Sequence, residues 1–101
     1  MQDEYFNKEC TIICIHIDNL NVINDIYKLN DIIDICRINN NEFIIFANKD
    51  FDLNQLKQIE VVYGFMRKNK FELVGDIVDL ANMYMLQVKN RKEKKKMKDK
   101  K

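Results

Sequence analysis

The chain has 101 residues, which suits one compact domain, and its two glycines and lack of proline argue against a disordered or low-complexity body. The net charge of +1 hides an asymmetry: residues 89–101 carry nine basic and two acidic residues, a net of +7, whereas the rest carries eight and fourteen, a net of −6. A basic tail on an acidic body is typical of contact with nucleic acid or of a nuclear address, although a solvated helix end gives the same pattern. We expect an N-terminal extension at residues 1–9, a folded domain at 10–75, and a helix with a basic tail at 76–101.

The chain has three cysteines, with no C-x-x-C pair, and a single histidine. This sparse set predicts no metal centre and no cofactor, and it indicates a reducing compartment in which the thiols act as small apolar groups. The acidic N-terminus lacks an apolar segment, so we expect no secretory signal. No apolar run approaches the roughly 18 residues of a membrane span, so we expect no membrane partner.

The first half of the chain predicts three strands and a helix. The β-branched run Cys10–Ile17 is bounded by charged residues and predicts the first strand. Apolar residues at helical spacing predict a helix at Asn19–Leu29. Ile32–Ile38 and Glu42–Ala47 predict the second and third strands, joined by a hairpin at Asn39–Asn41, because asparagine tolerates the left-handed backbone of tight turns.

The second half predicts a short helix, a strand and a long helix. Asp50–Ile59 begins with carboxylates that suit an N-cap, and it predicts the short helix. Val61–Phe65 and Phe71–Val74 are strand-like runs on either side of a basic loop. Gly75 is expected to end the strand and Asp76 to cap the long helix that follows. The apolar stripe of this helix contains Val74, Ile77, Val78, Ala81, Met85 and Val88.

The resulting β-α-β-β-α-β order, with an added C-terminal helix, predicts an α+β fold of the ferredoxin-like type. In this fold two helices back a four-stranded antiparallel sheet whose central strands are the first and the third. The other face of the sheet is free unless the last helix covers it.

Side-chain alternation assigns the residues of the two central strands to the two faces of the sheet. The set expected to face the helices is Ile13, Ile15, Ile17, Ile44 and Phe46, and the set expected on the free face is Cys14, His16, Asp18, Asn41, Phe43 and Ile45. His16 and Phe43 would then lie side by side as a stacking platform. Unpaired bases stack on such rings with about 1–3 kcal/mol per base.

Two segments resemble the motifs of the RNA recognition motif. IHIDNL, at Ile15–Leu20, resembles the RNP2 strand, with His16 at the aromatic position. NNNEFIIF, at Asn39–Phe46, resembles RNP1, where both phenylalanines match. Together with YGFMRKNKFELV and VKNRKEKKK, these segments make the chain similar to the spliceosomal snRNP A and B-double-prime proteins. The resemblance implies a non-enzymatic, nuclear RNA-recognition-type domain in a splicing ribonucleoprotein.

The same resemblance implies roles for single residues. The two rings would stack bases, the two asparagines would form hydrogen bonds, the isoleucine would give apolar support, and the cationic side chains would meet phosphates if the last helix lies near the RNA. The implied RNA-binding set is His16, Asn19, Asn41, Phe43, Ile45, Lys89 and Arg91. The implied partners are a small nuclear RNA stem-loop, other spliceosomal proteins and a leucine-rich-repeat protein at Tyr27 and Lys28.

A second resemblance leads to another class of function. RINNNEFIIF, at Arg37–Phe46, resembles the R-x-G-G-D-E-F hairpin of diguanylate cyclases, and IDNLNVINDIY resembles their I-D-x-F-x-x-I-N-D segment. This resemblance puts His16 and Asn41 at the two positions whose carboxylates hold magnesium. It also puts Asn39 and Asn40 at the glycines that let a nucleotide approach. It therefore implies a catalytically inactive domain with a regulatory or nucleotide-binding role.

A third hypothesis is a protein-interaction domain without RNA binding. Its candidate contacts are again Tyr27 and Lys28, unless Tyr27 belongs to the core, which we expect. Of the three hypotheses we favour the RNA-recognition interpretation, because it requires the smallest gaps relative to its family.

Overall fold

The structure is a computed structural model that describes residues 8–59 and 61–99, with side chains up to Lys92. This part of the chain forms four strands and three helices. They are β1 (Cys10–His16), α1 (Val22–Tyr27), β2 (Ile32–Arg37), β3 (Glu42–Ala47), α2 (Asn54–Lys57), β4 (Val62–Lys68) and α3 (Val74–Asp99). The predicted β-α-β-β-α-β order with an added C-terminal helix is confirmed.

The four strands form one antiparallel sheet in the order β2-β3-β1-β4. As predicted, β1 and β3 are the central strands, and the fold is α+β. The arrangement is compatible with a ferredoxin-like fold.

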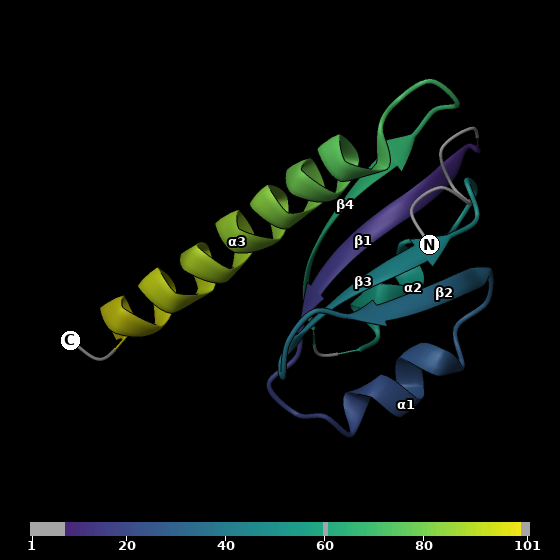
Figure 1. The fold of residues 1–101 in the computed structure, drawn as a ribbon. Coiled ribbons are helices and arrows are strands. Elements are labelled where there is room, and N and C mark those ends of the chain that lie inside the picture. Colours follow the sequence, from purple (N-terminus) through teal and green to yellow (C-terminus); the bar gives the residue numbers. More distant parts are fainter. Residues whose placement is uncertain (1–7, 60, 100–101) are drawn as a thin grey trace.

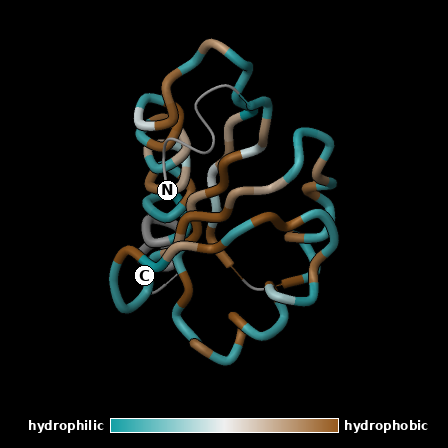
Figure 2. Tube along the Cα trace, turned by 45° about the vertical axis from the view of Figure 1, so that its right-hand side comes forward, coloured by the Kyte–Doolittle hydropathy of each residue, from teal (hydrophilic) through white to brown (hydrophobic). Residues whose placement is uncertain are grey.

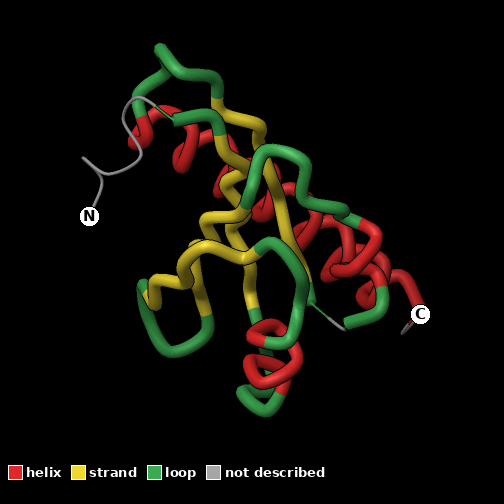
Figure 3. Tube along the Cα trace, turned by 90° about the vertical axis from the view of Figure 1, so that its right-hand side faces the viewer, coloured by secondary structure: helices red, strands yellow, loops and turns green. Residues whose placement is uncertain are grey.

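Helices cover both faces of the sheet (Figures 1 and 3). On one face, α1 and α2 pack over Ile13, Ile15 and Ile17, the isoleucines predicted to face the helices. On the other face, α3 packs its apolar stripe over a second core that includes Ile12 and Cys14. Hydrophobic colours accordingly run along the central strands, while the connecting loops are largely hydrophilic (Figure 2). The last helix therefore covers the face that an RNA-recognition sheet would leave open.

Gly64 allows α3 to lie against β4. A Cβ atom at this position would come within 2.2 Å of the Met85 backbone nitrogen and 2.4 Å of the Ala81 carbonyl oxygen. Real Cβ atoms do not approach other heavy atoms so closely, so a residue with a side chain at position 64 would push the helix backbone away from the strand. The contact brings Ile77, Ala81 and Met85 into the second core, where they are buried.

The predicted basic loop after Phe65 is wrong, because β4 continues to Lys68. Two charged residues of this segment stay in the strand because their side chains form hydrogen bonds with neighbouring backbone. The Arg67 guanidinium donates to the carbonyls of Lys49 and Phe51. The Lys68 ammonium donates to the carbonyl of Lys8 at 3.0 Å. Phe71–Val74 forms no strand before α3 begins.

The helix boundaries also differ from the prediction. α1 begins only at Val22, because the preceding residues form a turn in which the Asn21 amide donates to the Asn19 side chain at 3.0 Å. α2 is a single turn, preceded by an Asx turn at Asp52. α3 begins at Val74 and includes Gly75, so this glycine does not separate a strand from a helix.

The contact at Gly64 predicts that Gly64→Ala lowers the free energy of unfolding by about 1–3 kcal/mol or more, because the helix backbone must shift. Urea denaturation of the full chain measures this. Gly75→Ala is the matched control, since a Cβ there meets nothing within 4 Å in the first turn of α3. The control is expected to be neutral or to stabilise by up to about 1 kcal/mol. Equal effects of the two variants would contradict the close-contact explanation.

Candidate functional site

The predicted stacking platform does not form. Phe43 is 6% exposed and packs in the core under α1 and α2, together with Ile15 and Ile45. The reason is the register of the central pair: Phe43 lies opposite Ile15, and paired residues of an antiparallel ladder point to the same face. The outward assignment of Phe43 and Ile45 is therefore wrong, as is the inward assignment of Ile44 and Phe46, which face α3.

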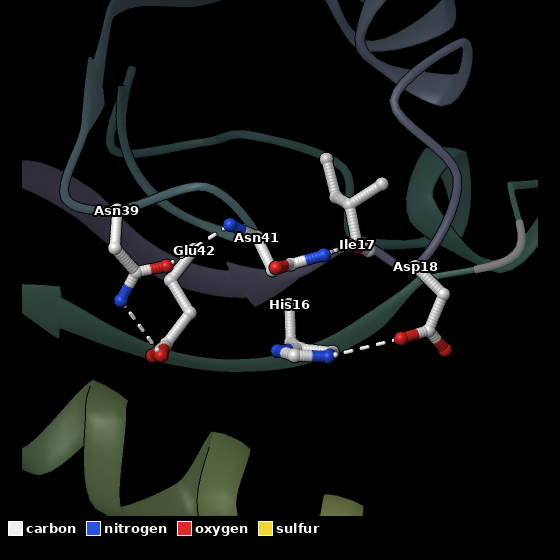
Figure 4. A network of polar contacts seen from close by, with 6 residues as sticks. All are labelled: His16, Ile17, Asp18, Asn39, Asn41 and Glu42. Atoms are coloured by element: carbon white, nitrogen blue, oxygen red, sulfur yellow. Dashed lines mark hydrogen bonds and ion pairs between the residues drawn. The ribbon is translucent and has the colours of Figure 1, made fainter.

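His16 lies on the face of the sheet that α3 covers, because it pairs with Val62 of β4, which packs against the second core; His16 and Phe43 are therefore on opposite faces. Its Nε2 is 3.1 Å from Oδ1 of Asp18, which is largely exposed (Figure 4). Its Nδ1 is buried and has no hydrogen-bond partner within the part of the chain that the structure describes. A buried polar atom without a partner is unusual.

The asparagines expected to contact RNA have partners within the chain. The Asn41 side-chain amide donates to the Ile17 carbonyl at 2.9 Å, which ties the β2–β3 hairpin to the end of β1 (Figure 4). Asn19 accepts from the Asn21 amide. Both side chains thus stabilise turns, and Asn19 also lines the pocket described below.

The β2–β3 hairpin is closed by its own side chains. The Arg37 guanidinium donates to the carbonyls of Asn39 and Asn40 at 3.0 and 3.2 Å, and the Asn39 amide donates to the Glu42 carboxylate at 3.0 Å. Asn39 and Asn40 stand at the positions that resemble the cyclase glycines. Their carbonyls already accept hydrogen bonds from Arg37, and both residues carry side chains that glycine lacks.

The residues at the cyclase-like metal positions do not fit magnesium. Mg²⁺ prefers carboxylate oxygens in octahedral geometry. Here the two positions hold an imidazole, His16, and an amide, Asn41, whose nitrogen already donates to a carbonyl. Among the side chains that the structure describes, up to Lys92, no three of His, Cys, Asp or Glu gather as metal ligands. We derive no metal-dependent step from this arrangement.

A pocket of about 700 Å³ opens beside His16, at the edge of the sheet where β1 ends and β4 begins. Three lysines reach it from two helices: Lys57 at the end of α2, and Lys89 and Lys92 on α3. The remaining wall contains Asp18, Asn19, Val22, Leu56, Ile59, Val61, Val62 and Tyr63. We call this cavity, with its three lysines and His16, the lysine pocket.

Sequence reasoning found only part of the lysine pocket. His16, Asn19 and Lys89 were among the predicted RNA-binding residues, whereas Lys57 and Lys92 were not. No spacing in the sequence connects positions 57 and 92, which come to line one pocket only through the fold. Arg91, also predicted to meet phosphates, is exposed and does not line the pocket.

The proposed partner contacts lie on α1. Tyr27 is 65% exposed, so the expectation that it belongs to the core is wrong, and Lys28 is exposed as well. Tyr27 borders a smaller cleft of about 350 Å³ whose floor includes Ile35 and Phe43. A leucine-rich-repeat partner on this surface stays a prediction.

The cysteines are not activated nucleophiles. Burial raises the pKa of Cys14 to about 11, helped by the charges of Glu42 and Asp79, and its thiol donates to the Val78 carbonyl. Burial also raises the pKa values of Cys10 and Cys36. A raised pKa leaves these thiols protonated at neutral pH, and Cys10, Cys14 and Cys36 form no disulfide with one another.

No protein family, curated protein or solved structure matches the chain. None of the helices in the described ranges has the length and apolar character that crossing a membrane requires.

The new position of Phe43 predicts that Phe43→Ala lowers the free energy of unfolding by about 3–5 kcal/mol, because it leaves a cavity in the core. Phe71→Ala is the matched control, since Phe71 is 92% exposed; its effect is expected to stay within about 0.5 kcal/mol. Thermal or urea unfolding of both variants measures the difference. A neutral Phe43→Ala would return this ring to the surface and restore the platform hypothesis.

Proposed function

We propose that this domain is a non-catalytic nucleotide-binding module and that the lysine pocket receives the phosphates. The observation that carries the proposal is that Lys57, Lys89 and Lys92 line one pocket together with His16. Three ammonium groups around one cavity repel one another, and a bound anion relieves that repulsion. We also propose that the sheet and its helices form a ferredoxin-like fold, with which the strand order is compatible.

The chemistry of the pocket suits a nucleotide. Its volume is within the range typical of small-molecule sites. Lysine acts as a compact point charge for phosphate oxygens, and the apolar wall, including Val22, Ile59 and Tyr63, offers a surface for a base. Asp18 at the rim pairs with His16, which orients the imidazole and limits the net positive charge.

The resemblance to diguanylate cyclases supports the class of ligand, and the departures from it support the absence of catalysis. Phosphoryl transfer by that family depends on magnesium held by carboxylates, whereas this chain has His16 and Asn41 at those positions. The module would therefore bind a nucleotide without turning it over, as a regulatory domain does.

We expect GTP to bind the full chain in the presence of EDTA, with an affinity that magnesium does not improve. Lys57→Gln and Lys89→Gln should each weaken binding about tenfold, because each removes a charge-assisted contact to phosphate. Isothermal titration calorimetry measures the affinities. Lys28→Gln is the matched control, since Lys28 is exposed on α1 and does not line the pocket.

The outcomes separate the parts of the proposal. Absence of GTP binding to the wild-type chain rejects the nucleotide ligand. An equal loss in Lys28→Gln rejects the lysine pocket as its site. Turnover of GTP with magnesium rejects the non-catalytic role.

RNA binding in a nuclear splicing ribonucleoprotein is the second candidate. One observation favours it: Lys89, Arg91 and Lys92 stand at the point where α3 continues into the lysine-rich end of the chain. An RNA held here would be bound by its phosphates rather than by stacking on the sheet, because α3 covers that face. Such binding depends strongly on salt and carries little sequence information.

The RNA candidate predicts that deleting residues 93–101 flattens the salt dependence of binding to a single-stranded octauridylate, because fewer phosphates are neutralised. Fluorescence anisotropy at several salt concentrations measures the slope. Octauridylate binding with no GTP binding would favour this candidate over the nucleotide module. An unchanged slope after the deletion would exclude phosphate contacts by the tail.

A further inference from the structure

The outer edge of β4 has unpaired backbone groups. β4 ends the sheet, and within the described part of the chain only β1 pairs with it. The Ile17 amide donates to the Asn41 carbonyl at 2.8 Å, in line with the β1–β3 register, so the odd-numbered residues of β1 bond to β3 and the even-numbered ones to β4. Through the β1–β4 register, Val62, Gly64, Met66 and Lys68 then bond inward. The amides and carbonyls of Tyr63, Phe65 and Arg67 point outward.

The other edge of the sheet is protected in a way that β4 is not. β2 has a register shift between Ile32 and Asp34, and the Asp34 carboxylate accepts from the Ile35 amide at 2.9 Å. Bulges and inserted charges of this kind prevent pairing with another strand. β4 keeps an unbroken register with β1 over all seven of its residues. It is therefore the better template for an added strand.

A groove of about 680 Å³ runs along the β4 edge. β4 forms its floor from Tyr63 to Arg67, and α3 forms one wall with Tyr84 and Val88. The wall exists because Gly64 lets the backbone of α3 lie against the strand. An added strand would thus find backbone partners along β4 and apolar side chains beside them.

Charge identifies the occupant. The lysine pocket adjoins the groove at Tyr63 and brings Lys57, Lys89 and Lys92. At the other end stands Arg67, whose guanidinium is positively charged but already donates to the carbonyls of Lys49 and Phe51. No acidic side chain of the described residues lines the groove. A second copy paired antiparallel to β4 would bring Arg67 of each chain toward the lysines of the other, and like charges there oppose association.

We infer that the β4 edge binds an extended acidic segment of a partner protein by strand addition. Backbone hydrogen bonds to Tyr63, Phe65 and Arg67 supply the affinity, while alternate apolar side chains of the segment lie against Tyr84 and Val88. The positive charge of Arg67 and of the lysine pocket favours an acidic segment over a basic or neutral one. The groove adjoins the lysine pocket at Tyr63, but its backbone hydrogen bonds do not depend on the phosphate-binding role proposed for that pocket.

The test uses the full chain labelled with ¹⁵N and an acetylated, amidated heptapeptide of alternating glutamate and valine. Saturating peptide is expected to slow amide exchange about tenfold or more at Tyr63, Phe65 and Arg67, and to leave Val62, Gly64 and Met66 unchanged, because only the first three amides gain a partner. The same peptide with alternate backbone nitrogens methylated should not bind. A lysine–valine heptapeptide should bind at least about tenfold more weakly at low salt.

Two matched variants locate the site. Tyr84→Glu puts a negative charge on the groove wall and should lower the affinity for the acidic peptide about tenfold. Leu86→Glu should change this affinity by less than about twofold. The two side chains are 41% and 42% exposed on the same helix, but only Tyr84 borders the groove. Unfolding curves of both variants confirm that the comparison is made between folded chains.

Several results would overturn the inference. Unchanged exchange at the three outward amides excludes strand addition, and equal effects of Tyr84→Glu and Leu86→Glu exclude the groove. Peptide binding that is lost in Lys57→Gln but not in Tyr84→Glu assigns the peptide to the lysine pocket instead. A dimer that protects the same three amides without peptide makes a second copy the occupant.

Discussion

The close packing of α3 on β4 at Gly64 is the contact on which the rest of the architecture depends. Because position 64 has no side chain, the helix backbone approaches the strand directly and closes the second face of the sheet. The sheet then becomes a middle layer with apolar residues on both sides. The same helix carries Lys89 and Lys92, which line the lysine pocket together with Lys57.

This layer arrangement explains which expectations from the sequence succeeded. β1 and β3 were predicted almost to the residue, because their β-branched runs are buried and bounded by polar residues. The helical stripe of α3 was predicted as well, since Ile77, Ala81 and Met85 recur at helical spacing. The short helices were overestimated in length, because turns at Asn19 and Asp52 capture backbone groups that a longer helix would use.

The facing of β3 could not be derived from its sequence. Phe43 and Ile45 on one side are as apolar as Ile44 and Phe46 on the other, so hydrophobicity does not decide which pair faces α1. Only the register with β1 decides which pair faces α1, and a shift of one residue would move every side chain of the strand to the other face of the sheet. The stacking platform depended on that choice, and the RNA-recognition hypothesis lost its main support with it.

The candidate site was predictable only where it coincides with a motif. His16 ends β1 and Asn19 follows it in a recognisable pattern, and Lys89 comes directly after the last apolar residue of the α3 stripe, Val88. Lys57 and Lys92 belong to no motif and become neighbours through the fold alone. The outward amides of β4 are likewise invisible in the sequence, because they follow from strand order and hydrogen-bond phase rather than from side chains.

α3 is the shared wall of two cavities, and this has a thermodynamic consequence. Lys89 and Lys92 border one cavity, and Tyr84 and Val88 border the other, all within three turns of one rigid element. A rotation of the helix about its own axis changes the shape of both cavities at once. If the nucleotide and the strand proposed above favour different positions of this helix, each changes the affinity of the domain for the other by the same factor.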